Sequence, residues 1–111
     1  VAVGGNAVIT DCDFIDNTAN SVTSADGSGA VYVNGNSNSI QTTVLIDGCN
    51  FFGNRATYSL SYGGAVGCVG NSSDPSKCLV TIQNSIFERN GANRGGAFFA
   101  SYGFVTLNNN W

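Results

Sequence analysis

The stretch Cys49-Asn50-Phe51-Phe52-Gly53-Asn54-Arg55-Ala56 decides the fold, because its pattern occurs three times in the chain. Related blocks occupy residues 12–19 and 85–92, and all three copies read Phe-x-x-Asn-x-Ala. An isoleucine lies five residues before the first Phe of each block. Self-similarity over several tens of residues is typical of repeat proteins, in which each unit packs mainly on its neighbours.

A second block, built around a Gly-Ala pair, follows each Phe-x-x-Asn at a variable distance. Its copies are Ser28-Gly29-Ala30-Val31, Gly63-Gly64-Ala65-Val66 and Gly95-Gly96-Ala97-Phe98. The aliphatic positions are separated by 37, 36 and 25 residues and are Ile9, Ile46, Ile82 and Leu107. The shortest copy therefore defines the minimal unit. The extra residues of the longer copies fall at 18–28, 34–43 and 70–77, which are rich in Ser, Asn, Gly and Asp and are predicted to be loops.

Composition favours short strands over helices. Only 10% of the residues are charged, 15 are Gly, and the chain has no Met, one Glu and one Lys. A unit of about 25 residues with three short apolar segments has the size of one rung of a three-faced solenoid. The sequence therefore predicts an all-β fold, a right-handed, single-stranded parallel β-helix with three strands per rung, about four rungs and long loops between strands. A β-sandwich is the alternative, but it does not explain a unit that shortens while the order of its motifs is kept.

Equivalent positions of successive rungs are expected to stack, because parallel strands pair about 4.8 Å apart. The expected aromatic stack in the interior contains Phe14, Phe51 and Phe87. A ladder of amides that hydrogen-bond along the axis is expected to contain Asn17, Asn54 and Asn90. We interpret both sets as structural ladders; the alternative for the Asn residues is a site that binds sugar or metal.

Charge and chemistry exclude several classes of function. The net charge is −3, and the four cationic side chains form no run, so nucleic acid is a poor partner. No apolar stretch approaches the roughly 20 residues of a spanning helix, so this segment is not expected to insert in a membrane. The chain has no His, and we predict no catalytic residue, no metal site and no cofactor. Asp11, Asp13 and Asp16 form no carboxylate ladder, because the next copy has Gly, Asn and Gly at their positions.

Four cysteines at repeat-related positions point to an oxidising compartment. Cys68 and Cys78 bracket a loop, and we predict that a disulfide joins them. Cys12 and Cys49 occupy the same repeat position, which places their Cα atoms within the range of a disulfide. They form either a second disulfide or a stack of buried thiols.

Further candidates lie in the loops and on the outer faces of the strands. Asn71-Ser72-Ser73 is an N-glycosylation sequon, so Asn71 is a predicted glycosylation site; the alternative is a polar turn that happens to spell this tripeptide. Tyr58 and Tyr62 fall in a loop, and Tyr32 and Phe99 share an outward repeat position. These rings either bind a sugar or protein partner or cover the edges of the core.

The repeats resemble those of the chlamydial polymorphic membrane proteins, whose passenger domains carry Gly-Gly-Ala-(Ile/Leu/Val) and Phe-x-x-Asn many times. The matching residues are Gly64-Ala65-Val66 and Phe51-Phe52-Gly53-Asn54, with similar residues in the other copies. The resemblance implies a secreted parallel β-helix that acts as an adhesin at a cell surface. The chain departs from the pattern at Ser28, which replaces the first Gly of one copy, and at Phe98, which replaces the aliphatic residue of another.

These observations together predict a function. We expect an extracellular or cell-surface structural or adhesive scaffold, part of a surface protein or fibre and not an enzyme. Residues 1–111 would form a single segment of a longer solenoid, or a unit that assembles end to end or laterally with other chains. Its loops would contact a host or matrix surface, with glycans as a further partner class. The alternative is a segment of a polysaccharide-acting lyase or hydrolase whose active site lies elsewhere.

Overall fold

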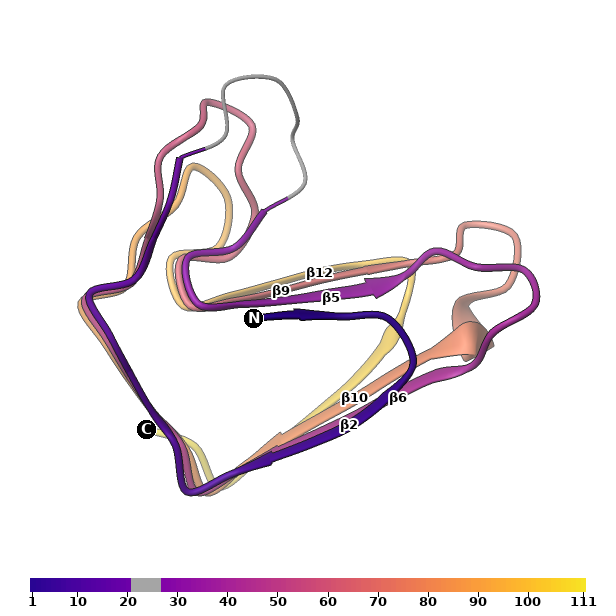
Figure 1. Ribbon diagram of the computed structural model, residues 1–111, viewed down its shortest axis with the longest axis horizontal. Helices are drawn as coiled ribbons and strands as arrows, with labels where there is room; N and C mark the ends of the chain where they lie inside the picture. Colours follow the sequence, from indigo (N-terminus) through magenta and orange to yellow (C-terminus); the bar gives the residue numbers. More distant parts are fainter. Residues whose placement is uncertain (21–26) are drawn as a thin grey trace.

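The computed structural model describes residues 1–20 and 27–111 and shows an all-β chain (Figure 1). All strand pairs of these residues are parallel. Their only helical element is the short 3₁₀ turn η1 (Pro75–Lys77). The predicted all-β class is thus confirmed.

Two four-stranded sheets contain the longer strands. In spatial order, the first sheet consists of β1 (Ala2–Val3), β5 (Val31–Gly35), β9 (Val66–Gly70) and β12 (Phe98–Ser101). In spatial order, the second sheet consists of β13 (Phe104–Asn108), β10 (Cys78–Gln83), β6 (Thr42–Asp47) and β2 (Asn6–Thr10). Neighbouring strands in each sheet are far apart in sequence, because the chain leaves a sheet, passes through the other sheets and then returns to add the next strand. Each such pass of the chain is called a level.

Two smaller sheets contain the Phe-x-x-Asn-x-Ala blocks. In spatial order, the third sheet consists of β11 (Ile86–Glu88), β7 (Asn50–Phe52) and β3 (Asp13–Ile15). The fourth sheet pairs two short strands, β4 (Thr18–Ala19) and β8 (Arg55–Ala56). Three strands per unit were expected from the sequence, and this fourth pair was not predicted. Its strands directly follow Asn17 and Asn54 of the first two blocks.

The register of the sheets matches the alignment of the sequence repeats. In the second sheet Ile9 lies beside Ile46, Ile46 beside Ile82, and Ile82 beside Leu107. In the third sheet Phe51 lies between Phe14 and Phe87. Successive passes of the chain therefore overlie one another in the view of Figure 1, and they differ mainly where the connections between strands differ in length.

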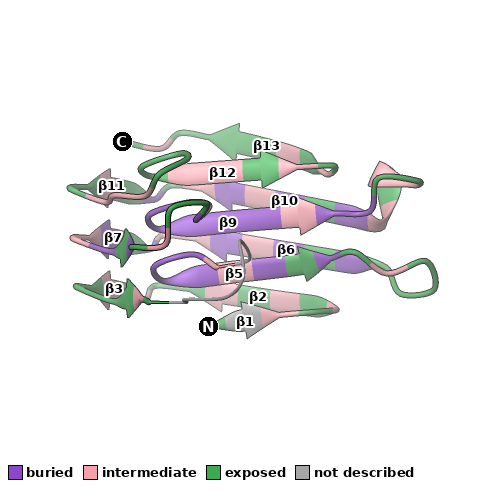
Figure 2. Cartoon of the chain, turned by 90° about the horizontal axis from the view of Figure 1, so that it is seen from above, coloured by how far each residue is buried: buried purple, intermediate pink, exposed green. Residues whose placement is uncertain are grey.

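Burial is greatest in the middle of the stack. Figure 2 shows the buried residues concentrated in β5, β9, β6 and β10, whereas the strands at both ends are exposed or only half-buried. Alternation along β6 and β10 directs one set of side chains inward, including Val44, Ile46, Val80 and Ile82, and the other outward. The inward side chains of β5, β6, β9 and β10 belong to one apolar core.

The corner between the second and third sheets requires a left-handed backbone at every level. Asp11, Asn84 and Asn109 have φ of 51°, 50° and 52°, and Gly48 has φ of 64°. Gly, Asn and Asp adopt this conformation at the lowest cost, which explains their recurrence at one repeat position. The corner is thus encoded by residue type and not by loop length.

The strand boundaries correct the predicted loops. Thr18 and Ala19 form β4, Asn34 and Gly35 belong to β5, and Gly70 belongs to β9. The connecting segments are consequently shorter than expected and cover residues 36–41 and 71–77 at one end of the sheets. Part of the first predicted loop, residues 21–26, lies outside the described residues.

Candidate functional site

The aromatic stack follows the third sheet from one side to the other. The Phe14 and Phe51 rings are stacked with centroids 4.9 Å apart and planes 3° from parallel, and the Phe51 and Phe87 rings with centroids 4.8 Å apart and planes at 6°. Phe51 is only 1% exposed, whereas Phe14 and Phe87 are half-buried. The ring spacing equals the strand spacing, because each ring comes from the same position of its strand.

The asparagines form a second ladder beside the rings. The backbone N–H and Nδ2 of Asn17 donate to Oδ1 of Asn54 at 3.1 and 2.8 Å. Asn54 repeats the pattern toward Oδ1 of Asn90, at 2.9 Å for both bonds. Nδ2 of Asn54 also donates to the Phe14 carbonyl at 2.8 Å, and Nδ2 of Asn90 to the Phe51 carbonyl at 2.9 Å. Asn54 is fully buried, so its amide satisfies backbone groups at the corner that no water reaches.

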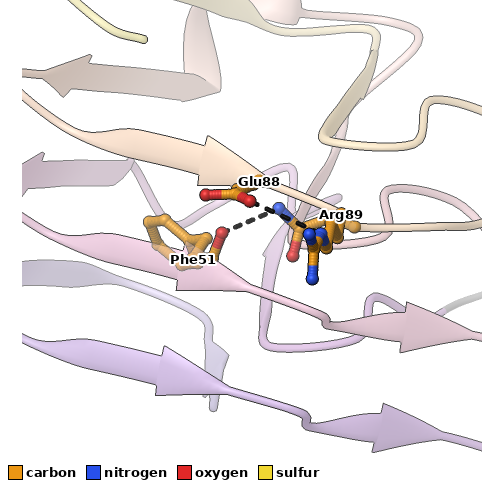
Figure 3. Close-up of polar contacts among 4 residues, drawn as sticks. Phe51, Glu88 and Arg89 are labelled. Carbon is orange, nitrogen blue, oxygen red and sulfur yellow. Dashed lines mark hydrogen bonds and ion pairs between the residues drawn. The ribbon is translucent and has the colours of Figure 1, made fainter.

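A row of exposed and half-buried side chains accompanies the aromatic stack on the outer side of the third sheet. It consists of Ile15, Phe52 and Glu88, which are paired in register. Nε of Arg89 lies 3.4 Å from the Glu88 carboxylate, and the guanidinium lies 5.5 Å from the centre of the Phe52 ring. Figure 3 shows Glu88 and Arg89 one strand away from Phe51. The Arg89 and Glu88 side chains are 74% and 58% exposed, so their ion pair contributes little stability.

Cys68, in the middle of β9, and Cys78, at the start of β10, meet in the interior. Both are fully buried as free thiols, and their sulfur atoms lie 3.0 Å apart. The hydrogen bond to Cys78 and burial raise the pKa of Cys68 well above its usual value. Gly35 makes room for this pair, because a Cβ atom there would lie 2.5 Å from Cβ of Cys78. The disulfide stays a prediction, and the structure brings together the two thiols that it requires.

Cys12 and Cys49 direct their thiols to backbone carbonyls. Sγ of Cys12 donates to the Thr10 carbonyl at 3.1 Å, and Sγ of Cys49 contacts the carbonyls of Asp47 and Ile9 at 3.4 and 3.6 Å. Burial raises the pKa of Cys49. The two residues lie one level apart, since the Asn50 amide donates to the Cys12 carbonyl. Both thiols are free in this structure, and the two alternatives, a disulfide or a stack of thiols, stay predictions.

Asn71 has a structural role in the loop that contains the sequon. The residue is 4% exposed, and its Nδ2 donates to Oδ1 of Asn38 at 2.6 Å. Its Oδ1 accepts from the amides of Ser73 and Asp74 at 2.8 and 3.3 Å. The nitrogen that a glycan would occupy therefore joins two loops, at residues 36–41 and 71–77. Glycosylation stays a prediction. The glycan would have to be attached to Asn71 before this loop packs.

Aromatic side chains also gather on the outer face of the first sheet. Tyr32 and Phe99 flank Gly67 in register, as the repeat alignment indicated. The Tyr62 ring stacks on Phe99 with a centroid distance of 4.3 Å, and the Arg94 guanidinium lies 5.5 Å from the centre of the Tyr62 ring. Sequence reasoning missed this contact, which a loop residue makes with a strand residue 37 positions away. The geometry fits the interpretation in which Tyr62 covers the sheet.

The acidic residues of the described parts of the chain act as separate hydrogen-bond acceptors and form no metal-binding group. Asp13 accepts from Nδ2 of Asn50 at 2.7 Å. Asp47 accepts from Asn84 and Gln83, and these hydrogen bonds lower its pKa. Within residues 1–20 and 27–111, no three His, Cys, Asp or Glu side chains lie close enough together to hold a metal ion. These carboxylates serve as hydrogen-bond acceptors between levels.

A shallow hollow of about 380 Å³ lies on the outer face of the second sheet. Its lining consists of Asn6, Ala7, Val8, Thr43 and Leu45. These side chains are apolar or neutral, so the lining contains no acid or base that could activate the Thr43 hydroxyl.

The comparisons with family models, curated proteins and solved structures found no match for this chain. In the part of the chain that the structure describes, no helix is both long and apolar enough to span a membrane. The assignment of a function therefore depends on the ladders, the loops and the exposed edges.

Proposed function

We propose that this chain forms a right-handed parallel β-helix that works as an extracellular structural or adhesive scaffold. In this proposal the stacked levels give a rigid rod, and the loops at residues 36–41 and 71–77 contact the partner. The partner is a host or matrix surface, including its glycans, or another protein chain. The resemblance of the Phe-x-x-Asn and Gly-Gly-Ala motifs to polymorphic membrane proteins supports a surface location.

The contrast between ladders and loops carries the proposal. Phe51 and Asn54 are buried in contacts that each level repeats, at distances that hardly vary. The connections between the first and second sheets vary in length and carry exposed side chains, such as Ile40 at 55%. A stack that is constant inside and variable in its loops suits presentation of loops, because the stack supplies stability and the loops supply recognition.

The chemistry of the described side chains favours a scaffold over a polysaccharide-acting enzyme. Such enzymes need carboxylates placed for acid and base work, usually with a cation beside them. Asp13 and Asp47 are both engaged with neutral amides. The hollow on the second sheet lacks any ionisable residue.

An attachment assay with matched surface variants tests the proposal. Beads coated with the purified chain are applied to host cells and to matrix glycans, and bound beads are counted. The loop variant Ile40→Glu with Ser72→Glu is expected to bind several-fold fewer beads, because both residues are exposed in the two loops. The control variant Thr43→Glu with Thr106→Glu adds the same charge on exposed strand positions and should bind normally. Equal attachment by all three proteins, or cleavage of acidic polysaccharide by the purified chain, would contradict the proposal.

A further inference from the structure

The glycosylation sequon Asn71-Ser72-Ser73 lies inside the loop that Cys68 and Cys78 bracket. The two cysteines are ten positions apart, and their sulfur atoms lie 3.0 Å from each other. Asn71 directly follows Gly70, the last residue of β9. A bond between the two thiols would therefore close a short ring of chain around the only sequon of the sequence.

The packed loop leaves no room for a glycan on Asn71. The side chain is 4% exposed, and its Nδ2, the atom that would carry the sugar, donates to Oδ1 of Asn38. A second hydrogen bond joins the same two loops, from Nε2 of Gln41 to the Ser76 carbonyl at 2.9 Å. A glycan on Asn71 would therefore hold the two loops apart, and it would have to be attached before they pack.

Glycan transfer and thiol pairing place opposite demands on this loop. In the transfer, Nδ2 of Asn71 loses a proton and forms a bond to the first sugar of a lipid-pyrophosphate donor, whose pyrophosphate leaves. In the pairing, a small disulfide such as oxidised glutathione exchanges with Cys68 and Cys78, which lose two protons and two electrons in forming their bond while the donor is reduced to two thiols. The first reaction needs an open loop, and the second closes it.

Oxidation of the thiols sets how long the loop stays open. Both thiols are free in this structure and Asn71 is nevertheless bonded to Asn38, so the loop packs without a covalent link. Such a loop can reopen locally, because surface connections open at a low cost in free energy. A disulfide between Cys68 and Cys78 would remove most of the open conformations.

We propose that the pairing of Cys68 with Cys78 decides whether Asn71 is glycosylated. The chain with reduced thiols accepts a glycan at Asn71, and the chain with the disulfide does not. The inference rests on the proposed function, because it requires a secretory route and concerns the loops that contact the partner. The glycosylated and unglycosylated chains would thus present different surfaces from the same stack of strands.

Synthesis of the chain behind a secretion signal, in an extract that contains glycosylating microsomes, tests the inference. The reaction is run with reduced or with oxidised glutathione, and a glycosidase-sensitive shift in electrophoretic mobility gives the fraction of glycosylated chain. We expect this fraction to be several-fold lower with oxidised glutathione. Asn71→Gln should show no shift in either condition, because the only sequon is lost.

Two double variants identify the thiols that are responsible. Cys68→Ala with Cys78→Ala should be glycosylated to the same, higher extent in both conditions. Cys12→Ala with Cys49→Ala is the matched control, since it removes the two other thiols, and it should keep the difference between the conditions. Each variant is compared with itself, so a change in folding that is independent of glutathione does not affect the result.

Three results would overturn the proposal. They are equal fractions in both conditions for the unchanged chain, absence of the glycan in both, and a difference that persists in the variant without Cys68 and Cys78. Bead attachment is measured separately on the unchanged chain. A missing redox effect with normal attachment would overturn the thiol control alone, whereas failed attachment with an intact redox effect would overturn the scaffold function alone.

Discussion

At the scale of the residue, two neighbouring phenylalanines have opposite environments. Phe51 is 1% exposed between two stacked rings, whereas Phe52 is half-buried on the outer side under Arg89. We expect Phe51→Ala to lower the free energy of unfolding by about 3–5 kcal/mol, the usual cost of truncating a buried ring. Phe52→Ala is the matched control and should cost clearly less. Thermal unfolding of both variants checks this, and equal midpoints would contradict the facing of the two side chains.

Individual residues also show why the environment of some side chains could be predicted from the sequence and that of others could not. Phe14, Phe51 and Phe87 stand at a fixed place in each repeat, so their alignment in sequence gives their alignment in space. Asn71 has no such place, because its partner Asn38 lies in an irregular segment whose course the repeat does not determine. Its tripeptide therefore suggested an exposed glycan site, while the structure buries the amide.

At the scale of the element, the Cys68–Cys78 pair joins the middle of β9 to the start of β10. We expect oxidation by a disulfide donor to link these two residues, because both thiols are already in contact. The link would close a short loop and stabilise the fold by about 3 kcal/mol in the chain-entropy view. Peptide mapping without reduction, and unfolding with and without reductant, check this. Free alkylation of both thiols after treatment with the disulfide donor would refute it and would weaken the proposal of an extracellular location.

Elements also show where sequence reasoning reached its limit. The strands around Ile9, Ile46 and Ile82 were predictable, because an aliphatic residue at constant distance from Phe marks the same strand in each unit. The pair β4 and β8 was not predicted, because Thr18-Ala19 and Arg55-Ala56 are too short to show an apolar alternation. Their pairing depends on the adjacent Asn ladder, which fixes the backbone at the preceding corner.

At the scale of the whole molecule, the protection of backbone amides against hydrogen exchange should decrease from the middle of the stack to both ends. Amides of β6 and β10 lie between strands on both sides, whereas β2 and β13 have a neighbour on one side only. We expect hydrogen exchange to be slowest in β6 and β10 and faster in β2 and β13, because end levels open without disturbing the centre. Site-resolved exchange measured by NMR checks this. Uniform protection across the second sheet would show that the levels open together.

The asparagine ladder has a further consequence, since its hydrogen bonds run in one direction. Asn17 and Asn54 each donate from the backbone N–H and from Nδ2 to the side-chain oxygen Oδ1 of the next Asn. One end of the molecule thus offers acceptors and the opposite end offers donors. Two like ends brought together would oppose acceptor to acceptor or donor to donor. Any filament that extended this ladder would therefore have a plus end and a minus end, and it would grow with every subunit pointing the same way.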